Sequence, residues 1–132
     1  MPPYVCQNPD SYLTKVVGNG QCVVFVQVAA GAPVTHAWKE GKKIQKGGAP
    51  LPKGTAIATF IEGKYPSHTH GNHAAIYIGQ NAEGLQVYDQ WASKDKATGA
   101  IKFQPVHART IHFHVLPGGS LSNNGNAFSV IE

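Results

Sequence analysis

The feature that most constrains this chain is a glycine-rich turn that leads directly into an apolar run. The turn covers residues 18–20, and Cys22 opens a nearly continuous apolar segment that continues to Ala30. Gly31 fits a C-terminal helix cap, and Pro33 cannot continue a backbone hydrogen-bonding pattern, so the segment ends there. The pattern predicts a short buried helix of about two to three turns.

The valines of this run also permit a buried strand, because a short apolar run does not separate the two by periodicity alone. We favour the helix because Asn19-Gly20 can cap it and because a helix N-terminus gives Cys22 a chemical role. Unpaired N–H groups and the positive end of the helix dipole lower the pKa of a thiol, and the thiolate is the nucleophilic form. Cys22 is therefore the candidate nucleophile, although a cysteine beside valines is more often a buried small hydrophobe.

The rest of the chain changes from helical to strand patterns after a loop rich in glycine and proline at residues 47–54. Before this loop we expect a helical turn capped by Asp10 or Ser11, and a short helix from Thr35 to Gly41 that turns Ala37 and Trp38 inward. After the loop, β-branched and aromatic residues predict strands at 55–61, 73–79, 85–91, 101–103, 110–115 and 127–131. The second and third strands form a hairpin. The predicted fold class is α+β, with N-terminal helices packed on an antiparallel sheet of five or six strands.

Composition limits the compartment and the partners. A chain of 132 residues is expected to form one domain over residues 1–132. No apolar run approaches the ~20 residues that cross a bilayer, and Met1-Pro2-Pro3-Tyr4 lacks the charged start of a signal peptide, so we expect neither membrane insertion nor a cleaved signal. The net charge of +4 favours an anionic polymer as partner. Nucleic acid and cell-wall material are both such polymers. No aromatic-rich RNA-binding signature accompanies the lysines at residues 39–46, so we expect no nucleic-acid partner and interpret the lysines as a solvated face rather than a substrate rim.

Two cysteines, Cys6 and Cys22, are too few for a disulfide scaffold. A bridge between them would remove the nucleophile, so a redox latch is the minor alternative. We expect Cys6 to be a free thiol without a role in the chemistry.

A cysteine nucleophile needs a neighbouring base, and the base needs a third group that orients its ring. His73 is the candidate base because it begins a predicted strand, where its ring can project toward a helix packed on the sheet. The partner strand of the hairpin offers Asp89 or Gln90, but not both, because successive strand residues point to opposite faces. Asp89 is preferred, since a carboxylate also stabilises the imidazolium that forms when the thiol ionises.

In their order and spacing, these motifs resemble a known family. The segments 20–23, 71–79 and 87–91 resemble the NlpC/P60 and CHAP group of papain-like amidases, and the likeness covers roughly residues 18–91. The run 71–91 and the ending 123–131 are most similar to the second family of type VI secretion amidase effectors. The resemblance implies a papain-like fold and a cysteine peptidase that cleaves the peptide crosslinks of peptidoglycan, at the bond between diaminopimelate and D-alanine.

The resemblance also implies the site and the partners. The implied catalytic residues are Cys22, His73 and Asp89, of which Asp89 departs from the histidine, asparagine or glutamate usual in the wider group. The backbone N–H of Cys22 would hold the oxyanion, with Gln21, Gln90 and Trp91 as candidates for oxyanion or substrate binding. The resemblance implies no cofactor, delivery by the type VI apparatus from the cytoplasm to the periplasm of a rival cell, stem peptides as substrate, and a cognate immunity protein.

The rival interpretation is metal binding. Three imidazoles lie within six residues, at His68, His70 and His73, and His112 and His114 add two more. Zinc favours imidazole ligands, but no His-Glu-x-x-His spacing is present. The alternative function is therefore a non-catalytic or metal-binding module of the same fold that binds cell-wall polymer. The ordered set of a cysteine, a histidine and an aspartate favours the enzyme.

Overall fold

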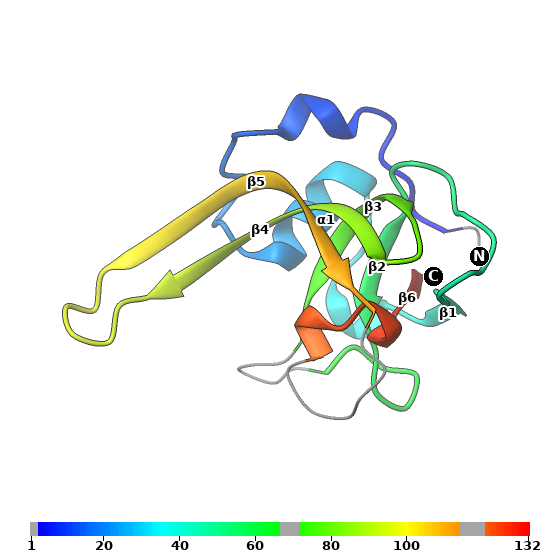
Figure 1. Cartoon of the computed structure of the whole chain (residues 1–132). Helices are drawn as coiled ribbons and strands as arrows, with labels where there is room; N and C mark the ends of the chain where they lie inside the picture. Colours follow the sequence, from blue (N-terminus) through cyan, green and yellow to red (C-terminus); the bar gives the residue numbers. More distant parts are fainter. Residues whose placement is uncertain (1–2, 67–71, 114–120) are drawn as a thin grey trace.

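Within the part of the chain that the structure describes, one α-helix packs against a six-stranded antiparallel sheet, and Figure 1 shows their arrangement. The structure is a computed structural model that describes residues 3–66, 72–113 and 121–132. The helix is α1 (Cys22–Ala30), and short 3-10 turns cover η1 (Pro9–Tyr12), η2 (Thr35–Ala37), η3 (Leu121–Asn123) and η4 (Gly125–Ala127). The strands are β1 (Glu40–Lys43), β2 (Ala56–Thr59), β3 (Ala74–Gln80), β4 (Gly84–Lys94), β5 (Ile101–His112) and β6 (Phe128–Ile131), in the spatial order β1-β6-β2-β3-β4-β5. This arrangement confirms the predicted α+β fold class.

The predicted helix is confirmed, but its cap differs from the prediction. Helix α1 ends at Gly31, which adopts the left-handed conformation at φ +74°. Its N-cap is Gln21, and the predicted cap residue Asn19 instead accepts a hydrogen bond from the Gln21 N–H over 3.0 Å. Gly20 has φ +86°, which side chains rarely adopt, so the glycine turn is needed to bring the chain into the helix.

The hairpin of β3 and β4 is confirmed, with Ile76 opposite Tyr88 and Tyr77 opposite Val87. The strand after it is longer than the sequence pattern indicated, because residues 101–103 and 110–112 of the two predicted strands belong to one strand, β5, while residues 114–115 of the second prediction lie outside the described residues. Pro105 lies between the two predicted strands. It falls where the register between β4 and β5 shifts, and such an irregularity accommodates a residue without an N–H.

The predicted elements before the glycine and proline loop are wrong in part. The first turn begins after Asn8, and neither Asp10 nor Ser11 caps it. The helix predicted from Thr35 is only the turn η2, and the chain then enters β1 because the Lys39 backbone exchanges two hydrogen bonds with that of Glu132, of 2.6 and 2.8 Å. Pairing with a strand from the far end of the chain therefore overrides the local pattern.

The core lies on both faces of the sheet. Phe25 and Val26 of α1 are fully buried against one face, and they form a cluster with Ile76 and Val106. A second cluster around Tyr77 fills the other face. Trp38 is buried as predicted, whereas Ala37 is exposed. No helix in the described ranges is long and apolar enough to cross a membrane.

Candidate active site

The thiol of Cys22 lies at the first residue of α1, where the helix approaches the start of β3. Its sulfur interacts with the His73 ring, the Ala74 backbone N–H and the Tyr65 hydroxyl. The first N–H groups of a helix have no partner within the helix, so this end concentrates donors and positive potential around the sulfur. The structure therefore brings the predicted nucleophile and the predicted base together.

Asp89 orients the His73 ring from the neighbouring strand β4. The distance from His73 Nε2 to Asp89 Oδ2 is 2.6 Å, and both side chains are buried, with relative exposures of 6% and 0%. The backbone of His73 is held as well, because its N–H donates to Thr59 Oγ1 over 3.0 Å and its carbonyl accepts from the Thr59 N–H over 3.0 Å. Of the two residues that strand alternation left open, Asp89 is the one that contacts the histidine.

Gln90 projects to the other side and holds the glycine turn. Its Oε1 accepts from the Val17 N–H over 2.8 Å, and its Nε2 donates to the carbonyls of Val17 and Gln21, each over 2.9 Å. Gln90 is fully buried, and these bonds use both ends of its amide. The expectation that Gln90 contacts substrate or an oxyanion therefore does not fit its position. Gln90 positions the turn that presents Cys22.

The other two expected binding residues are accessible. Gln21 is exposed at the N-cap of α1, directly before the nucleophile. Trp91 is 36% exposed, and its ring centroid lies 6.5 Å from that of His73. Both residues can therefore contact a substrate that reaches Cys22.

Strand β5 contributes two residues that sequence reasoning missed. The Nε of Arg109 donates to Asp89 Oδ2 over 2.8 Å, and its guanidinium carbon lies 5.2 Å from the centroid of the Trp91 ring. His107 stands directly opposite Asp89, with its Nδ1 3.1 Å from the Asp89 carbonyl oxygen. Asp89 Oδ1 is buried and makes no hydrogen bond within the described residues, and His107 Nδ1 is 3.8 Å from it. A prediction of one strand through 101–112 would have indicated these residues, because that strand pairs with β4 and places His107 opposite Asp89.

A second missed group comes from the loop before β3. Asn72 Nδ2 donates to the Tyr65 hydroxyl oxygen over 3.1 Å, and that hydroxyl interacts in turn with Cys22. The Tyr65 ring packs edge-on against Trp38 at a centroid distance of 4.9 Å. Loop residues carry no periodicity, so no pattern in the sequence indicates that Tyr65 and Asn72 meet beside Cys22.

The contacts shift the pKa values of the cysteine and the histidine in opposite directions. Burial acts to raise the pKa of the Cys22 thiol, but the hydrogen bond and charge of His73, with smaller contributions from Ala74 and Tyr65, bring that pKa below its ordinary value. Burial acts to lower the pKa of His73, but Asp89 and Cys22 together raise it to about 9. Burial and the charge of Cys22 raise the pKa of Tyr65, so its hydroxyl keeps its proton. Both shifts favour the ion pair of a thiolate and an imidazolium over the neutral thiol and imidazole.

The described residues do not contain a metal site. No group of three or more histidine, cysteine, aspartate or glutamate side chains among them is arranged to hold an ion. His68, His70 and His114 lie outside the described ranges, and His73 is engaged by Asp89 and Cys22. Cys6 is a free, buried thiol, and its sulfur lies 3.7 Å from Asn8 Oδ1.

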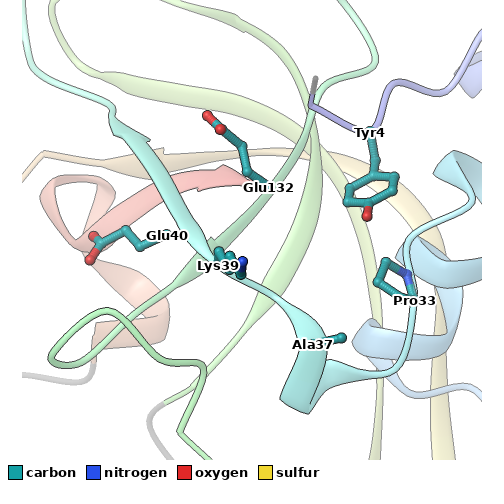
Figure 2. A pocket seen from close by; sticks show the side chains of 6 residues that line it. All are labelled: Tyr4, Pro33, Ala37, Lys39, Glu40 and Glu132. Atoms are coloured by element: carbon teal, nitrogen blue, oxygen red, sulfur yellow. The ribbon is translucent and has the colours of Figure 1, made fainter. Parts of the chain in front are cut away.

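A separate pocket of about 390 Å³ lies near the chain termini, and Figure 2 shows the side chains that line it. Two of its lining residues are acidic, Glu40 and Glu132, and Glu40 accepts a hydrogen bond from Ser129 over 2.7 Å. None of Cys22, His73 and Asp89 lines this pocket. The site described above is therefore the one in which a nucleophile, a base and an orienting carboxylate meet.

Comparison with known proteins places this geometry in a family. The family model of domesticated amidase effector 2 (Dae2) matches residues 2–131. The chain is 35% identical to a type VI secretion amidase effector 2 protein of Salmonella typhi over 136 aligned residues, which cover 98% of this chain and 99% of that protein. It is 31% identical to domesticated amidase effector 2 of Ixodes scapularis over 133 residues, which cover 96% of this chain and 83% of that protein.

A solved structure of a type 6 secretion amidase effector 2 (Tae2) superposes with a TM-score of 0.80 at 35% identity, over 99% of this chain and 95% of that one. This likeness confirms the papain-like α+β fold that the motifs implied. With a match over nearly its whole length, the chain belongs to the domesticated amidase effector 2 family.

Proposed function

We propose that this chain is a cysteine amidase that hydrolyses peptide crosslinks of peptidoglycan and acts as an antibacterial effector of type VI secretion. The observation that carries the proposal is the contact of Cys22 with a buried His73 whose Nε2 lies 2.6 Å from Asp89. The names of the relatives, amidase effectors of type VI secretion among them, agree with this chemistry. In this proposal residues 1–132 form one amidase domain.

The mechanism follows from the charges of the pair. The Cys22 thiolate attacks the scissile carbonyl, and the Cys22 backbone N–H and the helix N-terminus stabilise the oxyanion, with the exposed Gln21 amide as second donor. The protonated His73 gives its proton to the leaving amine, and a thioester remains on the sulfur. His73 then accepts a proton from water, which attacks the thioester, and the acid product leaves as the thiolate is restored. Asp89 holds the ring in one orientation through both steps.

Three further assignments concern the bond that is cleaved, the place of action and a partner protein. The proposed bond joins diaminopimelate to D-alanine, and the proposed place of action is the periplasm of a target cell. A cognate immunity protein would protect the producing cell by covering Cys22. The structural features in favour of this partner are the exposed groups around the nucleophile, Gln21 and Trp91.

The test is digestion of purified peptidoglycan by the wild type and by Cys22→Ala, with analysis of the released muropeptides by mass spectrometry. We expect the variant to fold, because it removes only one sulfur atom from a half-buried site, and to release no fragments. The matched control is Cys6→Ala, which removes the other free thiol and should still digest the polymer. Hydrolysis retained by folded Cys22→Ala would overturn the proposal.

A further inference from the structure

The far halves of β4 and β5 form a two-stranded arm. Figure 1 shows this arm extending away from α1 and from both chain ends. Its register runs from Trp91 opposite Gln104 to Lys94 opposite Ile101. The arm ends in a turn in which Asp95 Oδ1 accepts the N–H groups of Ala97 and Thr98, over 2.8 and 3.3 Å. The mechanism described above does not use this arm.

The base of the arm is attached to the turn that carries the nucleophile. The Phe103 ring packs so closely on Gly20 that a Cβ added there would lie 2.5 Å from a ring carbon. On the neighbouring strand, Gln90 donates to the Gln21 carbonyl over 2.9 Å. The arm is therefore held in a fixed position relative to Cys22, which follows Gln21 directly.

A groove of about 730 Å³ follows the arm from this point. It is lined by Gln21, Ala92, Ser93, Lys94, Asp95, Lys96 and Gly99. Lys94 and Lys96 are exposed, whereas the Asp95 carboxylate is engaged by the amides of the turn. The groove thus presents two ammonium groups along a path that ends at the helix N-terminus.

We propose that this groove binds the stem peptide of the peptidoglycan substrate, with Lys94 and Lys96 contacting its free carboxylates while Gln21 faces the scissile amide. The inference rests on the proposed amidase function and assigns a binding site to the same substrate. Charge complementarity selects the occupant, because a stem peptide is an extended chain that carries carboxylates and lysine ammonium groups bind carboxylates. The pocket in Figure 2 is less suited to such a ligand, because its charged lining residues are two glutamates, Glu40 and Glu132, and a single lysine, Lys39.

The test compares the double variant Lys94→Gln, Lys96→Gln with a control of equal charge change, Lys42→Gln, Lys43→Gln. The control lysines belong to β1, at the opposite edge of the sheet from β5. Each protein is assayed on two crosslinked muropeptides, one with free carboxylates and one with those carboxylates amidated. For the Lys94, Lys96 variant we expect KM on the free-carboxylate substrate to rise about tenfold, as for loss of charge-assisted hydrogen bonds, with kcat nearly unchanged. On the amidated substrate its KM should equal that of the wild type, and the control should match the wild type on both.

An unchanged KM on the free-carboxylate substrate would overturn the inference, and so would an equal loss on both substrates. Failure of the amidase proposal is recognised separately, because the wild type would then cleave neither substrate. Calorimetric binding of the same two peptides to Cys22→Ala protein, with and without the two lysine substitutions, repeats the comparison without hydrolysis. Equal dissociation constants with and without Lys94 and Lys96 would also contradict the groove.

Discussion

At the scale of single residues, Asp89 links the base His73 to Arg109 of β5. Its Oδ2 lies 2.6 Å from His73 Nε2 and accepts a hydrogen bond from Arg109 Nε over 2.8 Å, and the whole side chain is buried. Two cations therefore share one carboxylate oxygen. Changes at Asp89 and at Arg109 should shift the titration of His73 in opposite directions.

Asp89→Asn should lower the pKa of His73, because it removes the charge that helps to hold that pKa at about 9. The active form needs the Cys22 thiolate, which forms below the ordinary thiol pKa, and a protonated His73, which loses its proton as the pH rises through about 9. The pH profile of kcat/KM should therefore decline above about pH 9 in the wild type and at lower pH in the variant. The maximum rate should fall by roughly a hundredfold or more. An alkaline limb that stays in place would show that Asp89 does not set the titration of His73.

Arg109→Gln should act in the other direction on the same profile. Without the guanidinium, the Asp89 carboxylate acts on His73 alone, so the pKa of His73 rises and the alkaline limb moves to higher pH. We expect kcat/KM at neutral pH to fall about tenfold, because Asp89 loses a charge-assisted bond that orients it. Lys42→Gln serves as a charge-matched control on a distant strand. A limb that moves to lower pH, as in Asp89→Asn, would contradict this role.

The residues that sequence reasoning identified are those with a local signal. Cys22 stands at the start of a delimited apolar run, and strand alternation limited the partner of His73 to Asp89 or Gln90. Arg109 and His107 had no such signal, because they lie between the strands predicted at 101–103 and 110–115 and because their contact with β4 depends on the register. Tyr65 and Asn72 lie outside the helices and strands, where side-chain directions do not follow a period.

At the scale of elements, the position of Cys22 depends on the hydrogen bonds that join the backbone on either side of the glycine turn to β4. Gln90 makes three hydrogen bonds to the backbone of Val17 and Gln21, of 2.8 to 2.9 Å. The Gln21 carbonyl also accepts the first hydrogen bond of α1, from the Phe25 N–H. The start of the helix, and with it the place of Cys22, is therefore set by a side chain from the sheet.

Gln90→Leu should destabilise the protein by about 3 kcal/mol, because it leaves buried backbone groups of the turn without partners. The midpoint of urea unfolding would measure this loss. Activity should fall further than the folded fraction, since Cys22 loses its fixed approach to His73. The matched control is Gln86→Leu on the same strand, where the side chain is only partly buried and should cost little. Equal urea midpoints for the two variants would argue against a role of Gln90 in holding the glycine turn.

The elements that sequence patterns predicted well are those defined by local residues. Gly31 ends α1 by a left-handed conformation that the residue type favours, and the β3–β4 hairpin follows from two strand patterns joined by a short turn. Strand β1 was missed because its pairing partner, β6, comes from the other end of the chain. Such pairing depends on tertiary packing, which no local pattern encodes.

At the scale of the whole molecule, the order of the strands brings the chemistry together. Strands β3 and β4 are neighbours, and α1 packs on both. On the other side of β4, Arg109 of β5 binds the Asp89 carboxylate. The same two strands, β4 and β5, then continue outward as the arm that we propose for substrate binding. The catalytic groups and the proposed peptide groove are thus built on one continuous hairpin.

The central claim is that this chain hydrolyses a peptide bond of crosslinked peptidoglycan with Cys22. Mass spectrometry of purified crosslinked muropeptides, before and after digestion, tests it most directly. We expect the wild type to convert each dimer, by the addition of one water molecule, into two monomers with new ends at diaminopimelate and D-alanine, and we expect Cys22→Ala to leave the dimers intact. Dimers that persist with the wild type, or that the folded Cys22→Ala variant also cleaves, would contradict it.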